Sequence, residues 1–290
     1  MDMMINFPNI GIHLNNVGKS IHIGPLEIAY YGICIAIAVL AGIAMACYEA
    51  KRTGQDPEIY MDLAIYEIVC CIIGARLYYV IFKWDYYSRH LGEIVNLRNG
   101  GLAIYGAVIA AVITTTVYGK VKKQSPRVLL DTAGLGLVLG QIIGRWGNFF
   151  NREAFGDYTN NLLAMQLPVS AIRGNEITDI MEANSVVIDG IKFVQVHPTF
   201  LYEGLWNLCV FIFLNIYKKH KAFNGEVFLF YLGGYGIGRF FIEGLRTDQL
   251  QIGNTGIAVS QVLGITLFFA AIIIDIVVRI RIKESAKKAK

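Results

Sequence analysis

The stretch that decides the fold is VLLDTAGLGLVLGQIIGRWGNFFNREAFG, residues 128–156. Residues 128–149 are mostly apolar, and their number is close to the roughly 20 residues that a helix needs to cross about 30 Å of hydrocarbon. The end of this stretch, GRWGNFFNREAFG at 144–156, nevertheless holds two arginines, two asparagines and a glutamate. It therefore predicts a membrane-spanning helix that ends in a polar cluster.

The rest of the chain has the same character. Its 290 residues are 55% hydrophobic, with a mean hydropathy of +0.49, which lies outside the usual range of soluble proteins. Backbone in lipid must satisfy its own hydrogen bonds, and runs this long are not the alternating strands of a barrel, so they are predicted to be helices. We expect an all-α integral membrane protein, a single seven-helix membrane domain over residues 1–290, with spans at about 26–48, 60–82, 102–119, 128–149, 200–217, 225–244 and 257–279.

Basic residues predict the orientation of these spans. Lysines and arginines are concentrated in alternate loops, at 51–52, 120–127 and 218–221, and in the C-terminal segment 279–290. The positive-inside rule places these segments in the cytoplasm, with the N-terminus outside and the C-terminus inside. The final KESAKKAK either lies against anionic headgroups or serves as a solvated anchor. No removable signal peptide is evident.

The five cysteines all fall inside predicted spans. They form neither a disulfide framework nor a spaced metal site, so we interpret them as small packing residues. No metal, organic cofactor or nucleic-acid partner is expected.

The long connection 150–199 is predicted to be an extracytoplasmic insertion between the fourth and fifth spans. Within it, VVIDGIKFVQV at 186–196 places Asp189 and Gly190 between two β-rich arms, which is a strong hairpin signal. The insertion carries more acidic than basic residues. It is either a solubilising cap or a surface that guides substrate.

Three arginines, Arg76, Arg145 and Arg239, lie inside predicted spans. A charge at this depth costs about 2.5–3.5 kcal/mol on insertion scales, so it indicates a functional site. All three are expected at one depth near the outer surface. Polar residues of the inward-running spans are expected at the same level: Tyr31, Tyr105, His197, Tyr202 and Glu203.

Glycines precede two of these arginines, at 136, 140 and 144 and at 234 and 238. Small residues at such spacing let helices approach closely in membranes, although ordinary packing explains the glycines alone. Glu243 and Arg246 share a helical face with Arg239, and Arg145 is followed by Asn148, Asn151 and Glu153. Guanidinium groups suit phosphate or carboxylate, so the residues indicate a site for an anionic lipid headgroup. They leave open whether the lipid is bound, flipped or transformed.

Six motifs carry a resemblance to a known family: IGPLEIAYYGI, GARLYYV, GGLAIYG, GRWGNFFNREAFG, HPTFLYEGLW and YGIGRFFIEGLRTD, in this order along the chain. Together they resemble the bacterial prolipoprotein diacylglyceryl transferases over nearly the whole length. The resemblance implies an enzyme of the bacterial cytoplasmic membrane that transfers the diacylglyceryl group of phosphatidylglycerol to the lipobox cysteine of a preprolipoprotein signal peptide. A thioether forms and glycerol phosphate is released, without a cofactor.

The resemblance also implies which residues carry the reaction. The family's essential positions match Tyr31, Arg145, Asn148, Gly156, Arg239, Glu243 and Arg246. Arg145 and Arg239 would stabilise the charge that grows on the departing phosphate. With Tyr31 and Tyr105 they form the expected catalytic set, while Asn148, Asn151, Glu153, Gly156, Arg76, His197, Tyr202, Glu203, Glu243 and Arg246 are expected to bind substrate.

The chain departs from the family pattern where many members have a histidine, because it has Tyr105 there. A tyrosine, with a pKa of about 10, is a poor base at neutral pH. Tyr105 is then expected to orient the headgroup, while the thiol proton goes to His197, Glu153, water or no protein group.

The competing function is a lipid flippase or transporter, which needs a polar path to the cytoplasmic side. Signatures of intramembrane proteases are absent from the sequence.

Overall fold

The computed structural model describes residues 3–97, 100–253 and 255–288. Lys290 of the predicted basic tail lies outside these residues. The chain divides into two compact units, unit 1 with residues 1–42 and 135–290 and unit 2 with residues 43–134.

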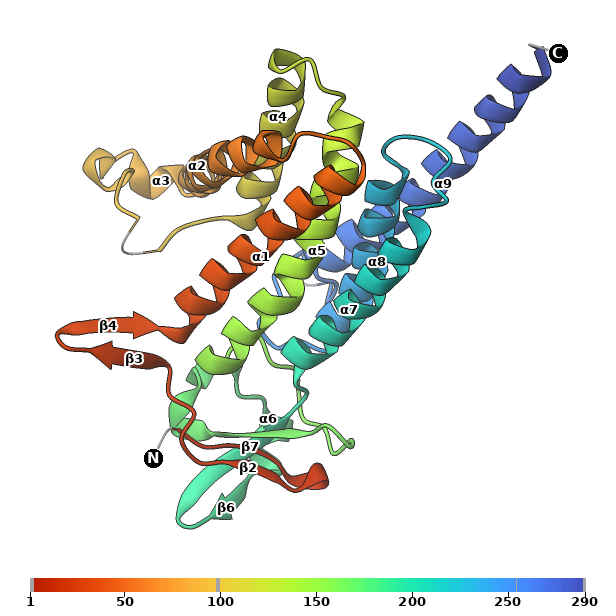
Figure 1. Ribbon diagram of the computed structural model, residues 1–290. Coiled ribbons are helices and arrows are strands. Elements are labelled where there is room, and N and C mark those ends of the chain that lie inside the picture. The colour runs from red at the N-terminus through yellow and green to blue at the C-terminus, as the bar shows by residue number, and fades with distance from the viewer. Residues whose placement is uncertain (1–2, 98–99, 254, 289–290) are drawn as a thin grey trace. The chain divides into compact units, whose positions relative to one another are not determined.

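Long helices occupy all seven predicted windows (Figure 1). They are α1 (Tyr30–Arg52), α2 (Pro57–Phe82), α4 (Ile104–Val121), α5 (Pro126–Asn151), α7 (Thr199–Tyr217), α8 (Glu226–Glu243) and α9 (Val259–Lys288). Within the described residues, six of them are long and apolar enough to cross a membrane. The exception is α8, which carries Glu226, Arg239 and Glu243 in its 18 residues. The chain is thus a mostly helical protein with six candidate spans.

Helix boundaries differ from the predicted windows at both ends of the chain. The first window begins at Leu26, but Leu26–Ala29 is strand β4, paired with β3 (Ser20–Ile23). The last helix continues about two turns past the predicted end at residue 279. Hydropathy marks the apolar part of an element, whereas its hydrogen bonds decide where the element begins and ends.

In unit 2, α2 packs against α4. An ideal Cβ added to Gly106 would lie 2.3 Å from the carbonyl oxygen of Gly74, so only glycine permits this approach. The short helix α3 (Trp84–Tyr87) and the 3-10 turn η2 (Leu91–Glu93) lie between the two helices in sequence.

In unit 1, α8 packs against both α7 and α9 (Figure 1). Glycines again set the closest approaches. A Cβ on Gly136 of α5 would lie 2.3 Å from the carbonyl oxygen of Gly42 on α1, and one on Gly236 of α8 would lie 2.4 Å from that of Gly264 on α9. The predicted glycine stripe on α5 is therefore a helix-packing surface.

Unit 1 also contains a five-stranded antiparallel sheet in the order β2-β1-β5-β7-β6. The strands are β1 (Ile5–Phe7), β2 (Ile12–Leu14), β5 (Met165–Pro168), β6 (Val186–Ile188) and β7 (Ile191–Val196). Four short elements accompany them: η1 (Pro8–Ile10), η3 (Val169–Ala171), η4 (Gly174–Glu176) and α6 (Asp179–Ala183). Figure 1 shows this layer at the end of α5 and the start of α7.

The predicted hairpin is present as β6 and β7. Its turn residues Asp189 and Gly190 both have positive φ angles, 51° and 77°, as a tight hairpin turn requires. The hairpin is not a separate element of the 150–199 connection, however, because β1 and β2 from the N-terminus complete the sheet. These three-residue strands are too short to show alternation in the sequence.

Candidate functional site

Two arginines from separate helices share one carboxylate in unit 1. Arg145 on α5 forms an ion pair with Glu203 on α7. Arg239 on α8 donates a hydrogen bond from Nη1 to the other oxygen of Glu203, at 3.2 Å. The expected convergence of Arg145 and Arg239 is thus seen directly, although the sequence did not indicate which residue joins them.

Further ion pairs extend from Arg239 along α8. Glu243 lies one turn away and pairs with Arg239 at 2.5 Å, and it is 3.8 Å from Arg246. Arg246 donates two hydrogen bonds to the carboxylate of Asp248, at 2.8 and 2.7 Å. Burial raises the pKa of Asp248, but the hydrogen bonds and charge of Arg246 outweigh burial, and the net pKa is below the usual aspartate value.

We define the charged cluster as Arg145, Arg239, Arg246, Glu203, Glu243 and Asp248. Its three positive and three negative charges balance when all six groups are ionised. Glu203 is the most enclosed of the residues that join the helices, with 4% of its side chain exposed, whereas Arg145 and Arg239 retain 21% and 16%. A ligand can therefore reach Arg145 and Arg239. Their positive charges are already neutralised by the carboxylates of the cluster.

A second polar layer lies one helical turn from the cluster, on the same helix faces. Gln141 precedes Arg145 by four residues, Asn207 follows Glu203 by four, and Tyr235 precedes Arg239 by four. Asn207 is 1% exposed, and neither its side-chain nitrogen nor its oxygen has a hydrogen-bond partner. The polar character of these residues did not by itself predict this layer, although their spacing by four from the charged residues was a usable signal.

The loop after α5 has an unusual backbone. Arg152 and Ala154 both adopt left-handed conformations, with φ angles of 55° and 57°, which non-glycine residues seldom do. Between them, Glu153 accepts a hydrogen bond of 3.0 Å from Asn148. Thr199 at the start of α7 donates to the carbonyl oxygen of Ala154. The loop thus holds Asn148 and Glu153 together, as expected from their clustering in sequence.

Gly156 joins three segments that are distant in sequence. Its N–H donates to the carbonyl oxygen of His197 at 3.0 Å, and it forms a β-bridge with Arg246. A Cβ at this position would lie 2.6 Å from the Leu245 carbonyl oxygen and 2.8 Å from the His197 Cβ. Gly156 is therefore required for close backbone contact, which also positions Arg246.

His197 and Tyr202 lie beside this junction. The Nδ1 atom of His197 is 3.2 Å from the Tyr202 hydroxyl, which accepts a hydrogen bond of 2.7 Å from Asn161. Burial lowers the pKa of His197, and the charge of Asp157 only partly opposes this. A neutral imidazole is accordingly favoured at neutral pH.

Tyr31 and Asn151 also belong to unit 1. The ring of Tyr31 lies against Gly147, where a Cβ would be 2.8 Å from it, and its hydroxyl is within electrostatic range of Glu153 and Arg145. Asn151 is the last residue of α5.

Arg76 and Tyr105 belong to unit 2. Arg76 donates four hydrogen bonds, of 2.7–2.9 Å, to the carbonyl oxygens of Glu93, Ile94, Gly100 and Gly101. Its guanidinium group thus organises the connection between α2 and α4, and phosphate binding by Arg76 stays a prediction. Tyr105 lies at the start of α4, with its ring 6.3 Å from that of Tyr78.

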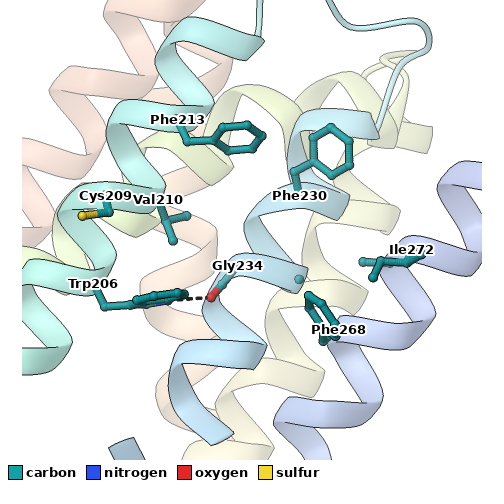
Figure 2. A pocket seen from close by; sticks show the side chains of 10 residues that line it. Trp206, Cys209, Val210, Phe213, Phe230, Gly234, Phe268 and Ile272 are labelled. Carbon is teal, nitrogen blue, oxygen red and sulfur yellow. Dashed lines mark hydrogen bonds between the residues drawn. The ribbon is translucent and has the colours of Figure 1, made fainter. Parts of the chain in front are cut away.

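An apolar pocket of about 320 Å³ lies among α7, α8 and α9 (Figure 2). Trp206 closes one end by donating a hydrogen bond of 2.7 Å to the Gly234 carbonyl oxygen, and Phe213, Phe230 and Phe268 line the walls. Gly234 precedes Arg239 by five residues, which is about 140° around the helix. The pocket therefore lies on a different side of α8 from the charged cluster.

Comparisons with known proteins identify the family of the chain. The family model described as prolipoprotein diacylglyceryl transferase matches residues 19–277. Phosphatidylglycerol–prolipoprotein diacylglyceryl transferases are among the similar proteins. That of Listeria welshimeri is 45% identical over 255 residues, 87% of this chain and 86% of its own length. Those of Finegoldia magna and Bacillus mycoides are 42% and 40% identical, over 91% and 93% of this chain and 96% and 94% of theirs. The chain belongs to the prolipoprotein diacylglyceryl transferase family.

Proposed function

We propose that this protein transfers the diacylglyceryl group of phosphatidylglycerol to the lipobox cysteine of a prolipoprotein, and that the charged cluster is its active site. The names of its relatives specify the lipid, the protein substrate and the transfer. The observation that carries the assignment of the site is the meeting of Arg145 and Arg239 at Glu203. Two guanidinium groups held by separate helices can bind one phosphate from two sides.

The reaction is a displacement at carbon. The cysteine thiolate attacks the glycerol carbon that carries the phosphate ester, the C–S bond forms, and the C–O bond breaks. The electron pair of the C–O bond stays on the phosphate, which leaves as glycerol phosphate with one more negative charge. Arg145 and Arg239 stabilise that charge because their positions are set before the reaction begins.

Residues around the cluster support this role. Glu243 and Glu203 orient Arg239, and Asp248 orients Arg246. Gly156 holds the backbone of Arg246 in place, and the pair Asn148–Glu153 presents polar groups at the end of α5. Tyr31 contributes a hydroxyl near Arg145. Tyr105 is proposed to orient the headgroup, since it is a poor base at neutral pH.

The proposed location is the bacterial cytoplasmic membrane, with α8 as a seventh span. A helix with three charged residues can be inserted where its charges are paired, and Arg239 pairs with both Glu203 and Glu243. The sheet and the 150–199 connection would then lie outside the cytoplasm, with the lipobox peptide arriving from that side.

The test is a reaction of purified protein with phosphatidylglycerol and a lipobox peptide, followed by mass spectrometry. We expect a peptide that carries a thioether-linked diacylglyceryl group. Arg145→Ala should lower the rate at least 100-fold, the effect of losing one preorganised charge-stabilising group. Arg127→Ala, an exposed arginine on the same helix, is the matched control and should react normally. An unmodified peptide under conditions where the lipid binds would refute the proposal.

A further inference from the structure

The carboxylate of Glu203 occupies the centre of the charged cluster. Glu203 contacts Arg145 and Arg239 at the same time, one oxygen to each. A phosphate held by both arginines competes with Glu203 for the guanidinium N–H groups that point toward each other across it. Glu203 therefore occupies the position that the substrate's phosphate would take.

We propose that Glu203 is an internal anion that neutralises Arg145 and Arg239 before lipid binds, is displaced by the phosphate of the lipid, and then takes the proton of the substrate thiol. This inference rests on the proposed function and adds to it the identity of the proton acceptor.

The charge balance of the site requires such a response. The cluster is neutral with three cations and three anions, so a phosphodiester brings one negative charge in excess. An uncompensated charge in an enclosed site is costly. The carboxylate that loses its two arginine partners therefore gains affinity for a proton, and the proton taken from the thiol moves its negative charge to the sulfur, from which the displacement passes it to the departing phosphate. Glu243 is less suited to this exchange because it also faces Arg246.

The displaced carboxylate has a partner one turn away. Asn207 follows Glu203 by four residues on α7, and residues at this spacing are neighbours on a helix surface. Its buried side chain has an amide nitrogen with no hydrogen-bond partner, and leaving such a group unpaired costs free energy. Asn207 can donate to Glu203 once Glu203 leaves the arginines, which makes displacement less costly.

The thiol proton passes from the cysteine sulfur to the Glu203 carboxylate, the sulfur bonds to the glycerol carbon, and the C–O electron pair leaves with glycerol phosphate. When glycerol phosphate departs, Glu203 releases its proton to water and pairs again with Arg145 and Arg239. A carboxylate placed beside the reacting phosphate ester is within the reach expected of a general base.

Glu203→Gln separates this role from a structural one. The amide keeps the shape of the side chain but removes the competing charge and the basic site. We expect short-chain phosphatidylglycerol to bind roughly tenfold more tightly, as expected when a charged hydrogen-bond partner no longer competes. We expect kcat to fall about 100-fold or more. Glu182→Gln on α6 makes the same change in charge at an exposed carboxylate that pairs with Lys192, and both constants should stay unchanged there.

The outcomes distinguish the possibilities. Tighter binding with slow turnover supports the proposal, whereas weaker or unchanged lipid binding, or an unchanged kcat, overturns it. Failure of the wild-type protein to form a thioether would instead refute the proposed function. If Glu203→Gln does not fold, Glu203→Asp serves as the second variant. Its shorter side chain should bridge the arginines less well, so it should also bind lipid more tightly while keeping part of the turnover.

A second pair of variants tests Asn207. Asn207→Leu should weaken lipid binding severalfold, because the displaced carboxylate then lacks its donor. Asn215→Leu is the control on the same helix, since Asn215 already donates to the Phe211 carbonyl oxygen. Equal effects of the two substitutions on lipid binding would contradict the role of Asn207.

Discussion

At the scale of single residues, the site depends on contacts that tolerate almost no change in size. Gly156 is the clearest case, because three segments meet at its backbone and a Cβ would overlap two of them. Its importance follows from the space around it rather than from any chemistry of its own. The family resemblance predicts a role for this position, and the close packing supplies a physical reason for that prediction.

Gly156→Ala should therefore displace the Leu245–Arg246 backbone and reduce the transfer rate at least tenfold. The overlap should also lower the free energy of unfolding by about 1–3 kcal/mol. Gly174→Ala is the control, because no atom lies within 4 Å of a Cβ there. Thermal unfolding in detergent and the peptide-modification assay measure the two effects. A fully active Gly156→Ala variant would contradict this account of the junction.

The buried imidazole of His197 should make the stability of the protein depend on pH. Its pKa is lowered by burial, so at mildly acidic pH the unfolded chain binds a proton that the folded protein does not. The contribution of His197 to stability is complete above the usual histidine pKa of about 6.5 and is lost as the pH falls below it. The melting temperature should thus decrease between pH 7 and pH 5. His197→Gln should reduce this decrease, and His22→Gln, at an exposed histidine, should not.

At the scale of elements, glycines allow each helix that carries an arginine of the cluster to cross a neighbouring helix closely. Gly136 faces Gly42, and Gly236 faces Gly264, in each case at a distance that excludes a Cβ. In membranes, close backbone packing replaces the hydrophobic effect as the source of helix association. These crossings hold α5, which carries Arg145, against α1, and α8, which carries Arg239, against α9.

Gly136→Ala should separate α1 from α5 and lower both thermal stability and activity. Gly32→Ala, on α1, meets no atom within 4 Å, and it should be neutral or stabilising by up to about 1 kcal/mol because alanine is the better helix former. Melting temperatures of the two variants in the same detergent provide the comparison. Equal melting temperatures would show that the α1–α5 contact is not closely packed.

At the scale of the whole molecule, the charged cluster has to face the side of the membrane from which lipid and peptide come. The basic segments at alternate ends of the helices predict an outside N-terminus and a cytoplasmic C-terminus, with α8 spanning the membrane. Six helices meet the requirements of length and apolarity among the described residues. If the charged helix α8 also crosses the membrane, the number of spans is odd and the two termini lie on opposite sides of the membrane.

Reporter fusions test this topology. A protease-sensitive tag at the N-terminus should be cleaved in intact spheroplasts, whereas the same tag at the C-terminus should be cleaved only after lysis. Seven spans require this difference, because an odd number of crossings separates the termini. Equal protection of both tags would mean that α8 does not cross the membrane.

Much of the architecture could be predicted locally. Seven long helices, the turn at Asp189 and Gly190, and the polar end of α5 each follow from residues within one short window. The predicted positions of helix ends were less accurate. At Leu26–Ala29, for example, the structure has a strand, because hydropathy does not distinguish a flanking strand from a span. The participation of β1 and β2 in the sheet could not be predicted, since β1 joins the sheet by pairing Asn6 with Gln166 of β5, about 160 residues away.

The sequence by itself determined the apolar character of the chain, the positions of the long helices, and the choice of Arg145 and Arg239 as candidate site residues. It could do so because the burial of apolar runs and the cost of a charge in lipid depend on local composition. Only the tertiary structure decided that both arginines meet at Glu203, that Asn207 is left without a partner, and that Gly156 joins three segments. These contacts arise between residues on different helices, and their geometry depends on how closely the backbones pack.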